Sequence, residues 1–186
     1  MLPSAAGPTT ADGPPDAPPL VSDMPSADPR PPLTLSVGGV TVRFGWRGDR
    51  WAHDVVGADG ARWQSIEAIG GAGDPRWPAS PVLVELSLLD TPAGPVILGV
   101  GLAGRSHFSA SVGPDPSHPE WLRFDLACRV NEPPEWLGST YDGPVGIVRL
   151  RPGSTAAPPA TVQWAYAFSA GGLVPLAGAR VEPPAD

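Results

Sequence analysis

The polar side chains with most chemical potential lie on two neighbouring predicted strands. Alternation along Arg105–Val112 places Arg105, His107 and Ser109 on one face and Ser106 and Phe108 on the other. In the next predicted strand, Trp121–Val130, the polar residues alternate with apolar ones. If the two segments pair as an antiparallel hairpin, one surface carries a set of candidate ligand-binding residues, namely Arg105, His107, Ser109, Arg123, Asp125 and Arg129.

On such a surface Asp125 could orient the His107 imidazole, and the arginines could bind an anionic or hydroxyl-rich ligand. The same pattern is also typical of an antiparallel sheet whose polar face is simply solvated. Both interpretations stay open on sequence grounds.

Covalent catalysis by a serine finds little support. The Gly104–Phe108 segment lacks the second glycine and the following helix of a Gly-x-Ser-x-Gly nucleophile turn. Ser106 points away from His107, and Ser109 lies about 7 Å along the strand, too far for a direct hydrogen bond. A small hydrolase or isomerase built on His107 and Asp125 remains an alternative.

The same region carries a family resemblance. The stretch Arg105–Ser111 reads Arg-Ser-His-aromatic-Ser-x-Ser, followed by Phe124–Arg129 and by Leu137-Gly138-Ser139-Thr140-Tyr141. In these motifs the chain resembles a group of uncharacterised bacterial proteins, over roughly residues 50–141. The resemblance implies no activity, but it directs attention to His107.

Other candidate sites are weaker. Metal ligands would come from His53, His107 and His118 with Asp54 or Asp125, but these residues show no ligand spacing, so we expect no metal or cofactor. The carboxylates could supply a glycosidase pair, although most fit outward strand or loop positions; they are Glu67, Glu85, Asp125, Glu132 and Glu135.

Seven tryptophans raise the possibility of sugar stacking. Trp46 and Trp164 fall in step with core residues, whereas Trp77 and Trp136 lie in predicted loops and should be the most exposed. Cys128, between Leu126 and Val130 in register, is predicted to be a core thiol.

The elements that would position these residues are β-strands. Short runs with a period of two, separated by Gly, Pro and Asp, predict an all-β sandwich or flattened barrel of about eight or nine strands. The nearly continuous apolar run Val82–Leu89 should pair with Val96–Leu102 as a buried central hairpin. The remaining predicted strands are Val40–Trp46, Trp51–Val55, Arg62–Ala68, Val145–Arg151 and Thr161–Phe168, and residues 70–81 are predicted to be a loop.

Residues 1–32 contain ten prolines and no periodic apolar pattern, which predicts a disordered Pro-rich tail before a single β domain over residues 33–186. The tail has neither the basic nor the apolar segment of a signal peptide. With a single cysteine and no long apolar run, we expect a cytoplasmic protein.

The net charge of −7 argues against nucleic acid and anionic membranes as partners. Because no catalytic motif is complete, the leading hypothesis is a non-enzymatic module that binds a small polar or anionic ligand or a protein. A third hypothesis is a structural subunit that pairs, or oligomerises, through an exposed strand edge.

Overall fold

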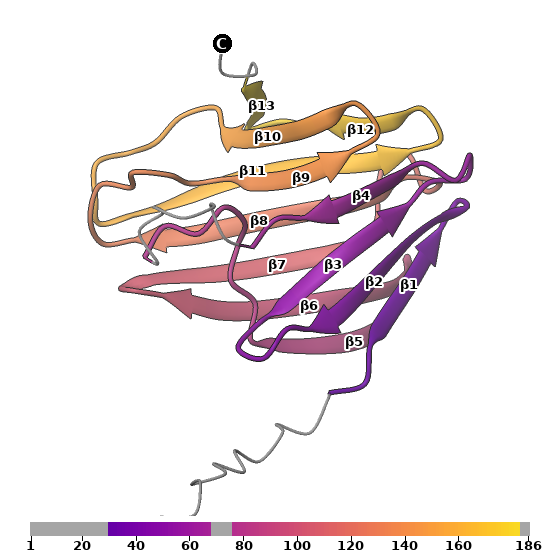
Figure 1. Cartoon of the computed structure of the whole chain (residues 1–186), viewed down its shortest axis with the longest axis horizontal. Helices are drawn as coiled ribbons and strands as arrows, with labels where there is room; N and C mark the ends of the chain where they lie inside the picture. The colour runs from indigo at the N-terminus through magenta and orange to yellow at the C-terminus, as the bar shows by residue number, and fades with distance from the viewer. Residues whose placement is uncertain (1–29, 68–75, 183–186) are drawn as a thin grey trace, which may run out of the picture.

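The computed structural model describes residues 30–67 and 76–182, and its elements are all β-strands (Figure 1). In chain order they are β1 Leu33–Val37, β2 Val40–Trp46, β3 Trp51–Val56, β4 Arg62–Ser65, β5 Glu85–Thr91, β6 Gly94–Ala103, β7 Ser106–Pro114, β8 Leu122–Val130, β9 Ser139–Gly143, β10 Gly146–Pro152, β11 Ala160–Ser169, β12 Gly172–Pro175 and β13 Ala179–Glu182.

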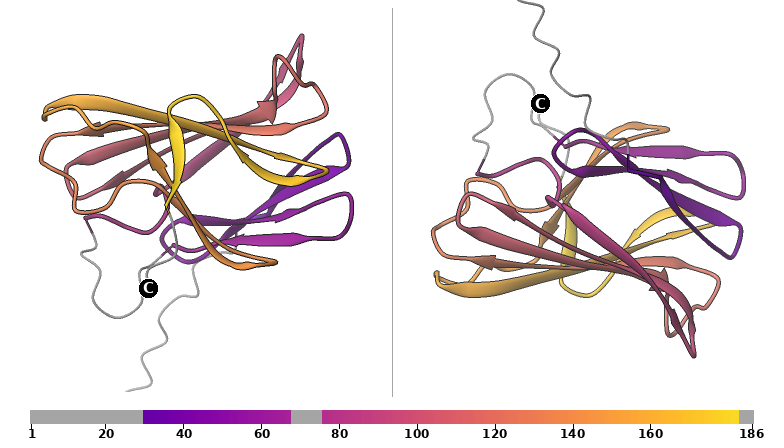
Figure 2. Two further views of the ribbon diagram at one scale, coloured as in Figure 1. Left: turned by 90° about the horizontal axis from the view of Figure 1, so that it is seen from above. Right: turned by 90° about the horizontal axis from the view of Figure 1, so that it is seen from below.

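The strands form two antiparallel sheets that pack face to face (Figure 2). The seven-stranded sheet has the order β1-β2-β3-β4-β9-β10-β13, and the six-stranded sheet has the order β12-β11-β8-β7-β6-β5. Neither sheet closes on itself, so the described part of the chain is a β-sandwich. The predicted all-β class is confirmed, and of the two predicted architectures the sandwich is the one found.

The core follows from alternation. Along β8 the inward residues Leu122, Phe124, Leu126, Cys128 and Val130 are all buried, and the residues between them are not. Phe124 stacks on Tyr166 with ring centroids 5.2 Å apart. Burying a side chain of this size contributes roughly 1.5–3 kcal/mol, so the two inner faces hold the sheets together.

The predicted number of strands was too low. The described residues form thirteen, and the four that were missed are β1, β9, β12 and β13. Each has only four or five residues, too few for a clear period of two. The hairpin of β2 and β3 was predicted correctly, with Phe44 opposite His53.

The apolar run at residues 82–89 pairs with β6 as predicted, but its assignment to the buried centre of a sheet was wrong. It is divided between two environments: Val82 and Leu83 are buried before the strand begins, whereas β5 itself is the exposed edge of the six-stranded sheet. Leu88 and Leu89 remain 48% and 47% exposed. Val82 crosses the inner face of β6 at Gly101, where a Cβ atom would collide with the Val82 carbonyl oxygen.

Most of the predicted tail, residues 1–29, lies outside the described residues, as do residues 70–75 of the predicted loop and the two residues before it, 68–69. The described chain begins at Arg30, whose guanidinium donates a hydrogen bond to the Val84 carbonyl at 2.7 Å and lies over the Trp46 ring. Among the described residues, no helix is long and apolar enough to span a membrane.

Candidate functional site

The outward-pointing side chains of β5, β6, β7, β8 and β11 form a surface that we call the outer face. Strand register arranges it in rows that cross the sheet. One row contains Leu102, His107, Arg129 and Thr161; the next contains Val100, Ser109, Ala127 and Gln163; the third contains Leu98, Ser111, Asp125 and Ala165. The predicted pairing of the His107 strand with the Asp125 strand is therefore present.

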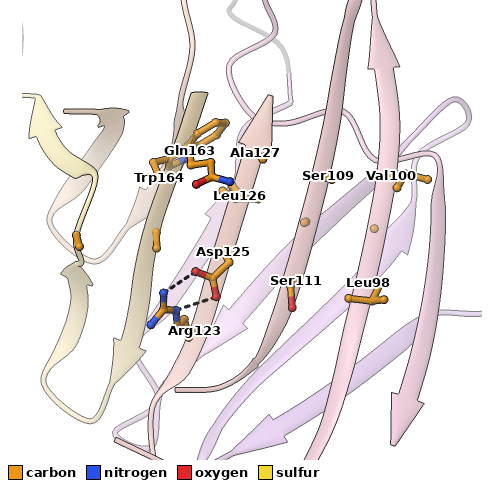
Figure 3. Close-up of a pocket in the computed structure, with 14 residues that line it drawn as sticks. Leu98, Val100, Ser109, Ser111, Arg123, Asp125, Leu126, Ala127, Gln163 and Trp164 are labelled. Carbon is orange, nitrogen blue, oxygen red and sulfur yellow. Dashed lines mark hydrogen bonds and ion pairs between the residues drawn. The ribbon is translucent and has the colours of Figure 1, made fainter. Parts of the chain in front are cut away.

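The outer face is hollowed over the second and third rows (Figure 3). The hollow has a volume of about 510 Å³, within the range of small-molecule sites. Apolar side chains of β6 border it on one side, serine hydroxyls of β7 lie along its middle, and polar groups of β8 and β11 border the other side. These groups are Leu98, Val100, Ser109, Ser111, Arg123, Asp125 and Gln163.

Arg123 is held between two carboxylates. Its Nε and Nη2 atoms donate to Asp125 at 2.8 and 2.6 Å, and its Nη1 atom donates to Asp115 at 3.1 Å. The hydrogen bond to Asp125 raises the pKa of Arg123. Burial of Asp115 opposes its ionisation, but the backbone N–H groups of Ser117 and His118, together with Arg123, leave the pKa of Asp115 lowered. Arg123 and Asp115 are therefore charged at neutral pH.

Three polar side chains in the hollow have no partner among the residues that the structure describes. Within the described residues, the hydroxyls of Ser109 and Ser111 and the amide of Gln163 make no hydrogen bond. Their hydrogen-bonding groups are open to solvent or to a ligand. Beside them Leu98 and Val100 are 40% and 49% exposed, so apolar surface adjoins the free polar groups.

The six residues predicted from the sequence are only partly brought together. Ser109, Arg123 and Asp125 line the hollow. His107 and Arg129 lie opposite each other one row beyond it and are exposed. Arg105 was predicted on the strand, but β7 begins at Ser106, and Arg105 lies in the tight turn that follows Gly104, whose φ of 56° favours glycine.

The predicted catalytic pairing is not formed. Asp125 lies opposite Ser111, and both of its carboxylate oxygens accept hydrogen bonds from Arg123. His107 is two rows away, and no hydrogen bond joins it to Asp125 in the described structure. The geometry therefore gives no support to an acid–base pair of His107 and Asp125.

Between the sheets lies a set of hydrogen-bonded side chains that sequence reasoning missed, and we call it the core hydrogen-bond chain. His53 Nε2 is 2.7 Å from the Tyr141 hydroxyl, which is 2.8 Å from the Tyr166 hydroxyl. Ser139 hydrogen-bonds the Tyr166 side chain and accepts a hydrogen bond from Trp164 Nε1 at 3.1 Å. All five residues are buried.

Burial determines the protonation of this chain. It lowers the pKa of His53 to about 3 and raises the pKa values of Tyr141 and Tyr166, so all three side chains are neutral. The His53 ring lies between Phe44 and Phe124, with centroids 5.0 and 5.3 Å away. An uncharged imidazole suits this apolar surrounding.

Glu67 lies two residues after the end of β4 and is half-buried, which differs from the outward position predicted for it. Its Oε1 atom accepts a hydrogen bond from Ser65 at 2.5 Å, and Ser65 Oγ accepts the His53 N–H at 2.8 Å. Its Oε2 atom is buried without a partner in the described structure, as is Trp51 Nε1. Burial raises the pKa of Glu67 to about 7.

One sequence signal could have located the core hydrogen-bond chain. Trp51, His53 and Val55 alternate along β3 and are all buried. The alternation thus indicated that His53 faces inward. It did not indicate the partner, because Tyr141 belongs to the short strand β9, which the sequence pattern did not reveal.

The histidines and tryptophans occupy separate places. His118 stacks on Trp121 with ring centroids 4.1 Å apart, and no group of three potential ligands in the described structure could hold a metal ion. Trp77, predicted to be exposed, is 2% exposed, and Trp136 is half-buried beneath Arg151. The loop tryptophans therefore offer no open stacking surface. Cys128 is fully buried, which confirms a core thiol, and this burial raises its pKa to about 12.

Comparison of the chain with protein-family models, with curated proteins and with solved structures gives no significant match. The resemblance to a bacterial group stays a prediction.

Proposed function

We propose that this protein is a non-enzymatic binding module that takes a small polar ligand in the hollow of the outer face. The observation that carries the proposal is the side-by-side placement of free hydrogen-bonding groups and exposed aliphatic side chains. Ser109, Ser111 and Gln163 supply the former, and Leu98 and Val100 supply the latter. A ligand gains from both, because it satisfies polar groups while it covers apolar surface.

The scaffold supports this role. Four of the strands beneath the hollow are nine or ten residues long and are paired on both sides, so their backbone is rigid. A site on such strands is preorganised, and ligand binding would cost little conformational entropy.

A blocking substitution tests the proposal. Ala127→Trp places a large ring within the hollow, whereas Thr161→Trp places the same ring on the same face one row outside it. A thermal-shift screen of the full chain should give stabilising compounds that Ala127→Trp loses and Thr161→Trp keeps. Hits that survive Ala127→Trp, or a screen without any hit, would show that the hollow is not a ligand site.

The free edge of β5 supports a second role, pairing with another copy of this chain. β5 is the longest edge strand, with seven residues, and exposes Leu88 and Leu89. The other three edge strands have four or five residues. An antiparallel pair with its two-fold axis at Leu88 would align Glu85 with Thr91 of the other copy, so no carboxylates face each other.

Light scattering coupled to size exclusion tests this second role on the full chain. The wild type should show a mass that rises toward a dimer with concentration, and Leu88→Lys should remain a monomer. Thr34→Lys, on β1 at the edge of the other sheet, serves as the matched control and should behave as the wild type. A wild type that stays monomeric at the highest concentration would rule out self-pairing.

A further inference from the structure

The charges that line the hollow are already neutralised by one another. Arg123 and Asp125 are its charged residues among those described, and Arg123 donates hydrogen bonds to both Asp125 and Asp115. An anion would compete with these carboxylates for Arg123, and a cation would compete with Arg123 for Asp125. Either ligand would therefore cost an existing charge-assisted hydrogen bond, so ions are poor ligands for the hollow.

The paired charges still offer hydrogen bonds to a neutral molecule. Each Asp125 oxygen accepts one bond from Arg123 and has a further lone pair, and the guanidinium has two N–H groups beyond the three already used. Acceptors and donors thus lie next to each other. Adjacent hydroxyl groups match that arrangement, because each hydroxyl can donate and accept.

The shape of the hollow selects a compact, flat molecule. Its floor between the borders is made of small side chains and one glycine, namely Gly99, Ala127 and Ala165 with Ser109 and Ser111. From Leu98 on β6 to Asp125 on β8 is two strand spacings, about 10 Å, and from Ser109 to Ser111 along β7 is about 7 Å. Figure 3 shows the aliphatic side chains on one border and the Asp125–Arg123 pair with Gln163 on the other.

We infer that the ligand is an uncharged polyhydroxylated ring, a neutral carbohydrate unit. Its C–H groups would lie against Leu98 and Val100, and its hydroxyls would bond Ser109, Ser111, Gln163 and Asp125. This inference rests on the proposed ligand-binding function and gives the chemical class of its ligand. Because the apolar border is aliphatic rather than aromatic, binding should be weak, and a method suited to weak binding is required.

NMR titration of the ¹⁵N-labelled full chain provides the test. The probes are neutral hexoses and disaccharides, their uronate and amino-sugar counterparts, and simple carboxylates and amines. Neutral sugars should shift the backbone amides of Ser109, Ser111 and Gln163. Their affinity should be unchanged between low and high salt, since no net charge is paired on binding.

Two variants locate the contact. Gln163→Leu removes the amide and should weaken neutral-sugar binding roughly fivefold, the worth of one neutral hydrogen bond. Thr161→Val, one row away on the same strand, should leave the affinity as in the wild type.

The possible failures are distinguishable. If charged probes shift the hollow amides with a salt-dependent affinity and neutral sugars do not, the hollow is a ligand site but the carbohydrate class is wrong. If neutral sugars shift amides elsewhere, the inference also fails. If none of the probes shifts the hollow amides, the carbohydrate inference fails, and if the thermal-shift screen also yields no hit the proposed function fails with it.

Discussion

The outer face and the core hydrogen-bond chain contain similar side chains that have different roles. The outer face contains a histidine, serines and a carboxylate, and so does the core hydrogen-bond chain when Ser65 and Glu67 beside it are included. Yet His107 is exposed and has no hydrogen-bond partner in the described chain, whereas His53 is buried and bonded to Tyr141. On the outer face polar groups remain free to meet a ligand. In the core, groups of the same kinds form hydrogen bonds with one another, and these bonds specify how the two sheets pack.

The difference teaches that environment, and not residue type, assigns the role. An imidazole on a wet strand contributes little to stability and is free for binding. An imidazole between Phe44 and Phe124 must be neutral and bonded, or the fold loses free energy. Substitutions at matched positions on the two sides of the sheet can therefore break or sharpen this comparison.

The largest difference in stability is expected between substitutions at two adjacent residues of β6. Gly101 faces inward against the Val82 backbone, and Val100 faces outward. Gly101→Ala should lower the free energy of unfolding by about 3 kcal/mol, because the backbone must shift. Val100→Ala should change it by less than about 0.5 kcal/mol. Urea denaturation measures both, and equal effects would contradict the assignment of inner and outer sides.

The next effect is a pH dependence in which Glu67 and His53 oppose each other. A raised carboxyl pKa, about 7 against an ordinary 4.5, gives stability that is present below pH 4.5 and lost as pH rises to 7. A lowered histidine pKa, about 3 against 6.5, gives stability that is present above pH 6.5 and lost as pH falls. Between pH 4.5 and 6.5 the two dependences should nearly cancel in the wild type.

In Glu67→Gln only the pH dependence that comes from His53 should remain. Its free energy of unfolding should fall by about 2.5 kcal/mol from pH 6.5 to 4.5, at about 1.4 kcal/mol per pH unit. His53→Phe should show the opposite slope. The exposed Glu135→Gln is the control and should follow the wild-type profile. A Glu67→Gln profile as flat as the wild type would mean that Glu67 does not titrate in this window.

A smaller effect is expected from cutting the core chain at its centre. Tyr141→Phe keeps the ring but leaves His53 Nε2 buried without a partner, which should cost about 2 kcal/mol. The double variant Tyr141→Phe with His53→Phe no longer contains the unpaired nitrogen. Its loss of unfolding free energy should therefore be smaller than the sum of the losses in the two single variants. Strict additivity, measured by denaturation, would show that the His53–Tyr141 bond is energetically irrelevant.

The contrast also explains how far the sequence could be interpreted. Alternation places one residue at a time on a face, and it located the outer-face residues Ser109 and Asp125 and the buried Cys128 correctly. It could not reveal which strands become neighbours through long-range pairing, such as β4 with β9, and this pairing brings Tyr141 to His53.

Apolar content alone also misplaced one strand. The Val82–Leu89 run was assigned to the centre of a sheet because buried strands are apolar, yet its buried part ends at Leu83, and β5 itself is a sheet edge. Whether an edge is left open depends on how many strands the rest of the chain supplies, and the sequence pattern of the run does not contain that information.

The smallest effect is expected on the outer face itself. Arg123→Gln removes the ion pairs to Asp125 and Asp115, but Asp125 is exposed, and Asp115 keeps its hydrogen bonds from the backbone N–H groups of Ser117 and His118. The free energy of unfolding should fall by less than about 1 kcal/mol, and by less still at high salt, as for other solvent-accessible ion pairs. Arg129→Gln, on the same strand and without an ion pair in the described structure, should leave the stability unchanged. If Arg123→Gln instead lowers the free energy of unfolding as much as Tyr141→Phe does, the ion pairs of the outer face stabilise the fold. Its polar groups would then serve stability rather than ligand binding.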